Sequence, residues 1–172
     1  RQMCKETEAK GKKFYQYTAL DEYSRWRYVE AFEEHSTYSS AHFLEHLIQR
    51  FPMPIECVQT DNGMEFTKRF STPGQVTLTA FQRTLKEHGI RHKLIRPFTP
   101  RHNGKVERSH RKDNERFYAT HTFYSFEDFS RQLQVYNRRD YNLFPMRPLG
   151  WKSPQTVLKE FIKAVSYTHL RA

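Results

Sequence analysis

The sequence predicts an α/β fold, in which helices pack on a mixed β-sheet. Two observations lead to this class. Runs rich in aromatic and β-branched residues occupy 14–20 and 26–32 on either side of a polar turn, which predicts a hairpin. Further along the chain, stretches with apolar residues at helical spacing alternate with short apolar runs. Strands that alternate with helices pack in layers, so a sheet flanked by helices is expected.

A helix and a third strand follow the hairpin. We expect Ser39 or Ser40 to cap the helix, because a serine side chain accepts a hydrogen bond from a free N–H of the first turn. The apolar face of this helix consists of Phe43, Leu44, Leu47 and Ile48. Prolines 52 and 54 do not suit a helix interior, and they introduce a short buried strand that ends near Thr60.

The second half of the chain is predicted to be mainly helical. The elements expected there are a helix at 78–88, a strand at 90–97, a loop at 98–104, a helix at 105–121 and an extended connection at 141–151. Gly89 is a suitable stop for the first of these helices. Ser125 and Asp128 stand in capping-box positions, and Ser153 precedes Pro154, a favoured first helical residue. An apolar stripe consists of Phe126, Phe129, Leu133 and Tyr136.

The composition describes a folded and strongly basic domain. Hydrophobic residues make up 37% of the 172 residues, enough for the core of one domain, which argues against wholesale disorder. Lys and Arg number 29 against 19 Asp and Glu, and the net charge of +10 indicates a polyanionic partner, either nucleic acid or an anionic membrane surface. No apolar run is long enough to cross a bilayer, and the N-terminal residues do not have the pattern of a secretory signal.

The two cysteines form no CxxC motif. Cys57 lies inside an apolar run, so we expect it to pack as a small hydrophobic residue. A reduced, cytoplasmic compartment fits this use of cysteine.

Asp61 and Glu107 are the candidate catalytic and metal-binding residues. Asp61 follows a predicted strand, and Gly63 permits tight reversal of the chain behind it. Glu107 lies on the helix that follows the 98–104 loop. Two carboxylates that converge repel each other, and a divalent cation between them favours their charged forms. Mg²⁺ or Mn²⁺ prefers such oxygen ligands, and two such ions can promote phosphoryl transfer. The alternative is that Asp-Asn-Gly is only a turn and Glu107 only a surface acid.

Basic residues gather around Glu107. Between residues 83 and 116 the chain has eleven Lys or Arg residues and four acids. Arg108, Arg111 and Lys112 surround Glu107 on a helix and can meet phosphates. The alternative is a solvated basic helix with Glu–Arg pairs. His88 and His92 are separated by Gly89 and lack further ligands at zinc spacing. His102 and His110 could contact DNA or serve as ordinary polar residues.

Four segments resemble the catalytic core of bacterial insertion-sequence transposases, which have a retroviral-integrase-like, ribonuclease-H-like fold. The most specific are "QTDNGMEF" and "LIRPFTPRHNGKVERSHRKDNERF", in this order. "YTALDEYSRWRYVEAF" is similar to the second and third strands of that family, and "YNRRDYNLFPMRPLGWKSPQTVL" to its C-terminal segment. The resemblance covers most of residues 13–160.

The resemblance implies a triad of two aspartates and a glutamate that binds two Mg²⁺ or Mn²⁺ ions. Its second acid corresponds to Asp61 and its glutamate to Glu107. The first aspartate normally lies in the first strand, and no aspartate precedes residue 13. Asp21 follows the second strand and is not assigned to the triad. The chain is therefore expected to lack the first catalytic strand, and "TKRFSTPGQVTL" is interpreted as an insertion between the two acids.

The resemblance also assigns roles to the neighbouring residues. Asn62 and Gly63 would shape the turn at the active site. A mobile loop over the site would carry Thr99, His102, Asn103 and Gly104. The contacts with DNA phosphates would come from Lys105, Arg108, Arg111 and Lys112, with His102 and Asn103 beside them. Phosphate contacts position DNA without reading its sequence.

The predicted function is DNA transposition or integration by metal-dependent end cleavage and strand transfer. The expected domains are an integrase-like catalytic core at 13–120, a C-terminal helical segment of the core at 121–163, and a tail at 164–172 that need not be native. The parent protein would be an enzyme, a strand transferase that acts on transposon ends and target DNA as a homo-oligomer in the bacterial cytoplasm. The alternative is a basic DNA-binding remnant without catalysis, since the first aspartate is missing.

Overall fold

The fold is built on a five-stranded mixed sheet with the order β3-β2-β1-β4-β5. The computed structural model describes residues 2–9, 12–67, 78–95 and 104–169. The strands are β1 (Gln2–Ala9), β2 (Lys12–Leu20), β3 (Arg27–Phe32), β4 (Cys57–Thr60) and β5 (Arg91–Leu94). The β1–β2 and β2–β3 pairs are antiparallel, and the β1–β4 and β4–β5 pairs are parallel. The predicted mixed sheet and its two hairpin strands are confirmed.

Strand β1 is a correction to the sequence analysis, which expects no strand before residue 14. It pairs with β2 from Gln2↔Ala19 to Ala9↔Lys12 and lies between β2 and β4. The strand position before β2 is therefore filled in the sheet. The eight residues of β1 read QMCKETEA and contain no aspartate.

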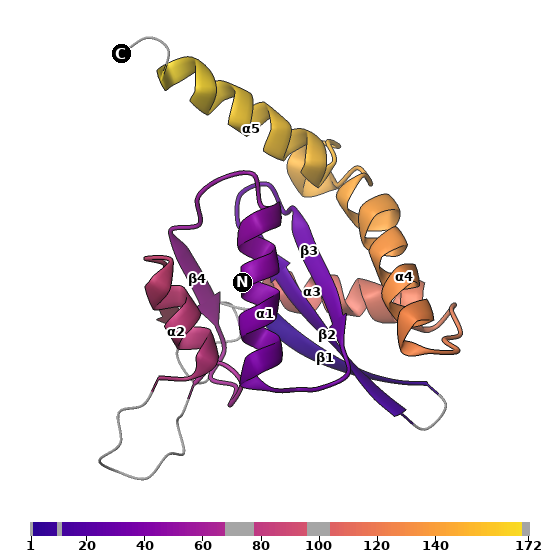
Figure 1. Ribbon diagram of the computed structural model, residues 1–172. Coiled ribbons are helices and arrows are strands. Elements are labelled where there is room, and N and C mark those ends of the chain that lie inside the picture. Colours follow the sequence, from indigo (N-terminus) through magenta and orange to yellow (C-terminus); the bar gives the residue numbers. More distant parts are fainter. Residues whose placement is uncertain (1, 10–11, 68–77, 96–103, 170–172) are drawn as a thin grey trace.

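Helices cover both faces of the sheet (Figure 1). They are α1 (Thr37–Arg50), α2 (Ala80–Glu87), α3 (Gly104–Asp113), α4 (Phe126–Tyr136) and α5 (Pro154–His169). Helix α1 crosses one face, α3 lies behind the other, and α5 projects away from the body of the molecule. Single turns of π-helix extend α3 and α4, at Asn114–Tyr118 and Asn137–Asn142, and a short 3-10 helix spans Arg147–Leu149.

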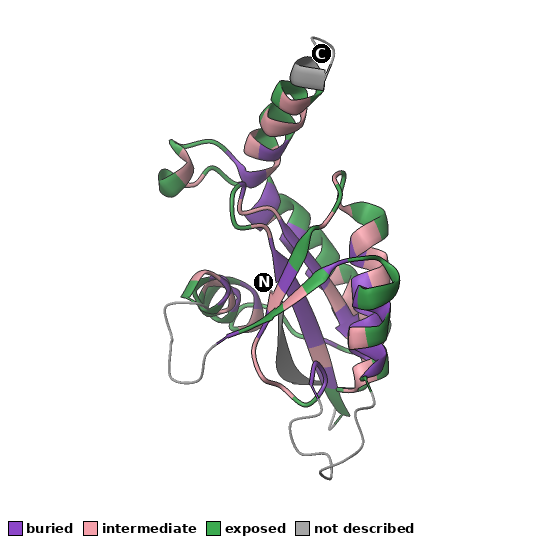
Figure 2. Cartoon of the chain, turned by 90° about the vertical axis from the view of Figure 1, so that its left-hand side faces the viewer, coloured by how far each residue is buried: buried purple, intermediate pink, exposed green. Residues whose placement is uncertain are grey.

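Two apolar cores lie on opposite faces of the sheet, because side chains alternate along a strand. On the α1 face, Tyr17 and Tyr28 pack against Phe43 and Leu44. On the other face, Phe14 and Val29 belong to a cluster with Phe117, Phe123, Phe129, Leu133 and Tyr136. Figure 2 shows many of the buried residues along the strands, and β2 and β3 are mostly buried, whereas the far part of α5 is mostly exposed. The predicted apolar stripes of α1 and α4 are thus confirmed as core faces.

The structure corrects four local expectations. Helix α1 begins earlier than predicted, because Ser36 is the cap and its side chain accepts a hydrogen bond from the backbone N–H of Ser39. Helix α5 continues through His169, into the segment interpreted as a tail. The 141–151 connection is not extended: it ends in a tight turn closed by a bridge between Met146 and Lys152. Cys57 is exposed rather than packed in the core, because β4 begins at this residue.

Candidate active site and nucleic-acid interface

Asp61 lies directly after β4, as predicted, in a turn that its own side chain closes. Its Oδ1 accepts a hydrogen bond from the backbone N–H of Gly63 at 3.0 Å. Asn62 reaches across to β5, where its Nδ2 donates to the carbonyl oxygen of Ile95 at 3.0 Å. The backbone N–H of Ile95 in turn donates to the carbonyl oxygen of Thr60. The turn is therefore tied to two neighbouring strands, and the carboxylate of Asp61 has a defined position.

Thr60 and His92 support the turn from inside the sheet. The Thr60 hydroxyl donates to the backbone carbonyl of Asp61 at 2.9 Å, and His92 Nε2 lies 2.9 Å from the same hydroxyl oxygen. A hydroxyl carries one proton, so Nε2 of His92 is the donor in the second bond. Burial lowers the pKa of His92, which keeps its ring neutral. His92 thus supports the Asp61 turn through Thr60.

The carboxylate of Glu65 is the neighbour of Asp61 that sequence reasoning missed. Glu65 is buried, and its Oε1 lies 2.9 Å from Nε2 of His35. Together with Asp61 these residues line an open hollow of about 680 Å³. Burial raises the pKa of Asp61, the hydrogen bond from Gly63 lowers it, Glu65 raises it and His35 lowers it. The "EF" that follows "TDNGM" was the available signal for a second acid near Asp61.

Gly63 is required for space rather than for an unusual backbone conformation. Among the described glycines, only Gly89 and Gly150 have a positive φ. A Cβ placed on Gly63 would lie 2.4 Å from Oε2 of Glu65. The small residue therefore leaves room for the Glu65 carboxylate beside the Asp61 turn.

Glu107 lies on the first part of α3 and is exposed to solvent. The residue before it, Val106, is fully buried against Leu20 and Tyr141. Leu20 ends β2, and its neighbour Ala19 pairs with Gln2, which also pairs with Thr60 of β4. The first turn of α3 therefore packs at the end of β2, on the residue that follows the row in which Ala19, Gln2 and Thr60 lie side by side. The intervening residues 96–103, with Thr99, His102 and Asn103, lie outside the described part of the chain.

The predicted phosphate-binding residues divide into three groups. Lys105, Arg108 and Lys112 line one groove beside α3. Arg111 is exposed but pairs with Glu115 one turn later, at 3.1 Å. His110 points inward, where its Nε2 lies 3.0 Å from the Thr18 hydroxyl. Among the predicted phosphate-binding residues that the structure describes, Lys105, Arg108 and Lys112 lie together on the groove side of α3.

The charge on that surface is concentrated. Burial lowers the pKa of Lys112, and the neighbouring cations Arg116, Arg108 and Arg27 lower it further, while Asp113 opposes them. A bound anion would relieve this repulsion between like charges. The basic face of α3 therefore has the electrostatics of a phosphate-binding surface.

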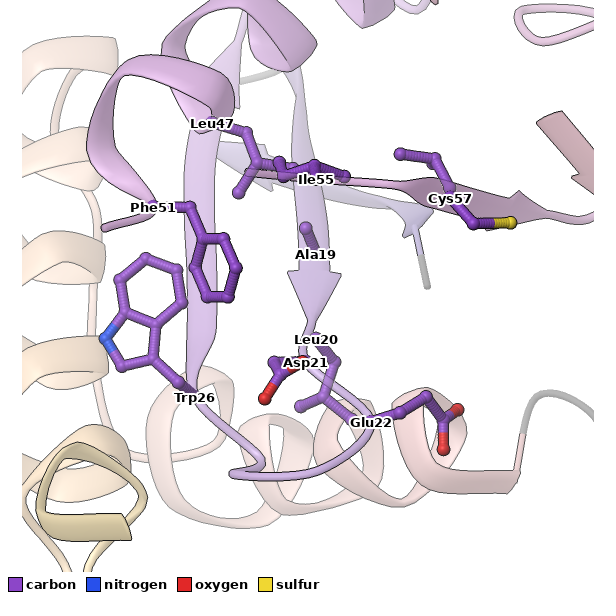
Figure 3. Close-up of a pocket in the computed structure, with 10 residues that line it drawn as sticks. Ala19, Leu20, Asp21, Glu22, Trp26, Leu47, Phe51, Ile55 and Cys57 are labelled. Carbon is purple, nitrogen blue, oxygen red and sulfur yellow. The ribbon is translucent and has the colours of Figure 1, made fainter. Parts of the chain in front are cut away.

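A separate cavity of about 170 Å³ opens between α1 and the strand ends (Figure 3). Trp26, Leu47, Phe51 and Ile55 form its apolar wall, with Asp21 near its mouth. Oδ2 of Asp21 accepts hydrogen bonds from the backbone N–H and the hydroxyl of Ser24, at 2.8 and 2.6 Å. This acid therefore stabilises the β2–β3 turn, in agreement with its exclusion from the triad.

The donor atoms at Asp61 fit a hard divalent cation in type, but the described residues do not complete a coordination set. A half-buried carboxylate beside a second acid, with a raised pKa, is a place where added positive charge is favourable. Within residues 2–9, 12–67, 78–95 and 104–169, no group of three His, Cys, Asp or Glu side chains could hold a metal ion.

The mixed sheet with helices on both faces is the architecture of an integrase core, and the comparison with known families agrees. The chain belongs to the Integrase core domain family, which it matches over residues 4–100, more than half of its length. A second Integrase core domain family matches residues 88–154. The predicted membership of the integrase core family and the integrase-like, ribonuclease-H-like fold are confirmed.

Two curated relatives are each 28% identical to the chain. One is the "Retrovirus-related Pol polyprotein from transposon TNT 1-94" of Nicotiana tabacum, whose alignment covers 96% of this chain and 12% of the relative. The other is the "Putative integrase ORF3" of Spiroplasma virus SpV1-C74, whose alignment covers 62% of this chain and 31% of the relative. The chain thus spans less than a third of the length of either protein.

Solved integrase cores share the fold. The catalytic core domain of BIV integrase superposes with a TM-score of 0.65 at 19% identity, over 95% of both chains. The catalytic core domain of HTLV-2 integrase, solved in complex with magnesium in a trimeric form, gives a TM-score of 0.66 at 16% identity, over 91% of this chain and 92% of that one. In the described part of this chain, no helix has the length and apolar character needed to span a membrane.

Proposed function

We propose that the chain is the core segment of a DNA integrase or transposase that takes part in strand transfer. The observation that carries this proposal is the exposed Glu107 within the basic face of α3, in a chain that places a second acid, Asp61, directly after β4. DNA phosphates bound by Lys105, Arg108 and Lys112 would be held beside Glu107. The family and the fold support DNA integration or transposition as the general activity.

The residues of the chain would bind and orient the reacting DNA. The cations of α3 position the backbone without reading its sequence. The Asp61 turn, fixed by Asn62 and Thr60, presents one carboxylate at the end of β4. Glu107 would present a second carboxylate from the exposed side of α3. Two divalent ions, Mg²⁺ or Mn²⁺, would supply activation of the attacking oxygen and stabilisation of the leaving oxygen when bound by these acids.

The proposed assembly is a homo-oligomer on DNA. The HTLV-2 core domain is described in dimeric and trimeric forms, which supports this proposal for the present chain. Strand transfer joins two DNA ends to a target, so more than one active core is needed in the assembly. A cytoplasmic protein that acts on DNA fits the basic charge of the chain.

A second candidate function is DNA binding without catalysis. Strand β1 occupies the position where the family resemblance expects an aspartate, and its residues Gln2–Ala9 contain none. A site with only Asp61 and Glu107 would hold metal ions weakly. The basic face of α3 does not depend on the missing acid, so DNA binding would remain.

The experiment that tests the proposal measures cleavage and joining of labelled transposon-end DNA with Mn²⁺. It compares the chain with its Asp61→Asn and Glu107→Gln variants. We expect activity from the chain, lost in both variants. Glu115→Gln is the matched control, because it removes an exposed acid from the turn of helix that extends α3. Activity that survives both site substitutions would contradict the assignment, and salt-dependent DNA binding by a chain that shows no activity would support the second candidate.

A further inference from the structure

A groove of about 630 Å³ separates α3 from the tight turn that precedes α5. We call it the α3 groove. Its basic lining residues are Arg25, Lys105, Arg108, Lys112 and Arg147, and its aromatic lining includes Tyr141, Phe144 and Trp151. These residues come from three parts of the chain: the β2–β3 turn, α3 and the 141–151 segment. No acid is among the described residues that line it.

The cations of the α3 groove are largely available to a ligand. Lys105 forms an ion pair with Glu22. None of the other ion pairs between described residues involves the remaining four cations of the groove. Two of these four, Arg25 and Arg147, lie outside α3 and were not predicted as phosphate contacts. The groove therefore presents positive charge from both of its walls.

The aromatic side of the groove is held in an unusual backbone conformation. Trp151 is 70% exposed and has a φ of 62°. Arg25, on the opposite wall, has a φ of 63°, and in the described chain these are the only non-glycine residues with a positive φ. Bulky residues rarely adopt this conformation. The turn enforces it at Trp151, whose N–H donates to the carbonyl oxygen of Met146 at 3.1 Å while Lys152 accepts from the Met146 N–H at 3.0 Å.

We propose that the α3 groove binds a single-stranded segment of DNA, with its phosphates on Arg25, Arg108 and Arg147 and a base stacked on Trp151. Proteins that hold single strands combine a positive groove with exposed aromatic rings. The volume of the groove is that of a site for a small organic molecule, which suits one or two nucleotides. Lys105, Arg108 and Lys112 belong both to the basic face of α3 and to the α3 groove. This inference therefore rests on the proposed function, and it specifies which form of DNA contacts α3 beside Glu107.

Tryptophan fluorescence tests the stacking contact. The chain has two tryptophans, so Trp26→Phe leaves Trp151 as the reporter. An oligothymidylate of about eight nucleotides is expected to quench this signal and to bind with an affinity that falls steeply with salt. Trp151→Asn, which tolerates the left-handed backbone, is expected to weaken binding about tenfold. Equal quenching by an oligo-glutamate peptide of the same charge would overturn the assignment of a base to Trp151.

A pair of double variants separates the groove from net charge. Arg25→Asn with Arg147→Gln removes two charges from the groove, and Lys159→Gln with Lys163→Gln removes two exposed charges from α5. We expect the first pair to lose oligothymidylate binding at least tenfold and the second to lose about twofold or less. Equal losses would overturn the groove assignment.

Duplex DNA distinguishes this inference from the proposed function. If transposon-end duplex binds with steep salt dependence while Trp151 gives no signal with oligothymidylate, only the groove assignment fails. If neither form of DNA binds with salt dependence, the proposed function fails as well. Circular dichroism of each variant shows that a loss of binding is not a loss of fold.

Discussion

Arg27 and Asp113 form an ion pair that is completely enclosed by the protein. NH1 of Arg27 donates to both carboxylate oxygens of Asp113, at 2.8 and 2.9 Å, and both side chains are 0% exposed. The pair joins β3 to the end of α3. Nε of Arg27 donates to Asn137 Oδ1 at 2.8 Å, and its guanidinium lies 3.8 Å from the centre of the Tyr141 ring. This contact therefore connects the sheet, the helix that carries Glu107 and the C-terminal segment.

Removal of one partner of this pair is expected to destabilise the fold strongly. Asp113→Ala would leave the Arg27 charge buried without its carboxylate, at a cost of about 3–5 kcal/mol. Urea unfolding followed by circular dichroism measures the loss. The double variant Arg27→Met with Asp113→Leu is the control, because it removes both charges. Its loss of unfolding free energy should be smaller than the sum of the losses in Arg27→Met alone and Asp113→Leu alone. Additive losses would show that the two side chains act independently.

Asp61→Asn is expected to stabilise the protein at neutral pH. Burial and Glu65 raise the pKa of Asp61, so the native state holds its proton more tightly than the unfolded chain does. The protonated Asp61 side chain therefore contributes to the stability of the native state at low pH. This contribution is lost as the pH rises from 3.8, the ordinary pKa of an aspartate, through the raised pKa of Asp61. Because the group is only half-buried, we expect a rise in Tm of about 1–3 °C at pH 7 that disappears below pH 4.

Asp21→Ala is the contrast for this measurement. It removes the acceptor of two hydrogen bonds in the β2–β3 turn and should lower Tm at pH 7. If Asp61→Asn lowers Tm at pH 7 by about as much as Asp21→Ala does, the carboxylate of Asp61 stabilises the fold, and this would contradict the prediction.

Gly63→Ala is expected to destabilise the protein by about 1 kcal/mol, because the added methyl group displaces the Glu65 carboxylate from its contact with His35. Thermal unfolding measures the effect, and the variant that also carries Glu65→Ala should recover part of it. Gly104→Ala is the matched control. Nothing lies within 4 Å of a Cβ at Gly104, in the first turn of α3, so its effect should be within about 0.5 kcal/mol. Equal losses at both glycines would argue against the steric explanation.

The parts of the fold that the sequence predicts are those with local signals. The strands at 14–20 and 26–32 show dense aromatic and β-branched residues, and Gly89 ends α2 with a positive φ of 66° as a helix stop should. Strand β1 lacks such a signal, because its side chains are mostly polar. Its strand conformation follows from pairing with β2 along its whole length. The cap of α1 was predicted at Ser39 or Ser40, whereas the side chain that caps the helix is that of Ser36.

The candidate site likewise has some features with a local sequence signal and others that depend on residues far apart in the chain. The position of Asp61 after a strand could be predicted, because the change from apolar to turn residues is local. The contact between His35 and Glu65 could not, since 29 positions of intervening chain separate these residues. The α3 groove likewise depends on how the 141–151 segment folds back on α3. That Asp61 and Glu107 act as one catalytic and metal-binding pair stays a prediction.

Paramagnetic broadening by Mn²⁺ in the NMR spectrum tests that pairing most directly, and it needs no catalytic activity. At millimolar Mn²⁺, backbone amide signals of residues 62–65 and of residues 105–109 are expected to broaden together, because one ion would contact both carboxylates. Either Asp61→Asn or Glu107→Gln should weaken the broadening at both segments, whereas Glu115→Gln should leave it unchanged. Broadening confined to one segment, or broadening at each segment that responds only to its own substitution, would contradict a shared site.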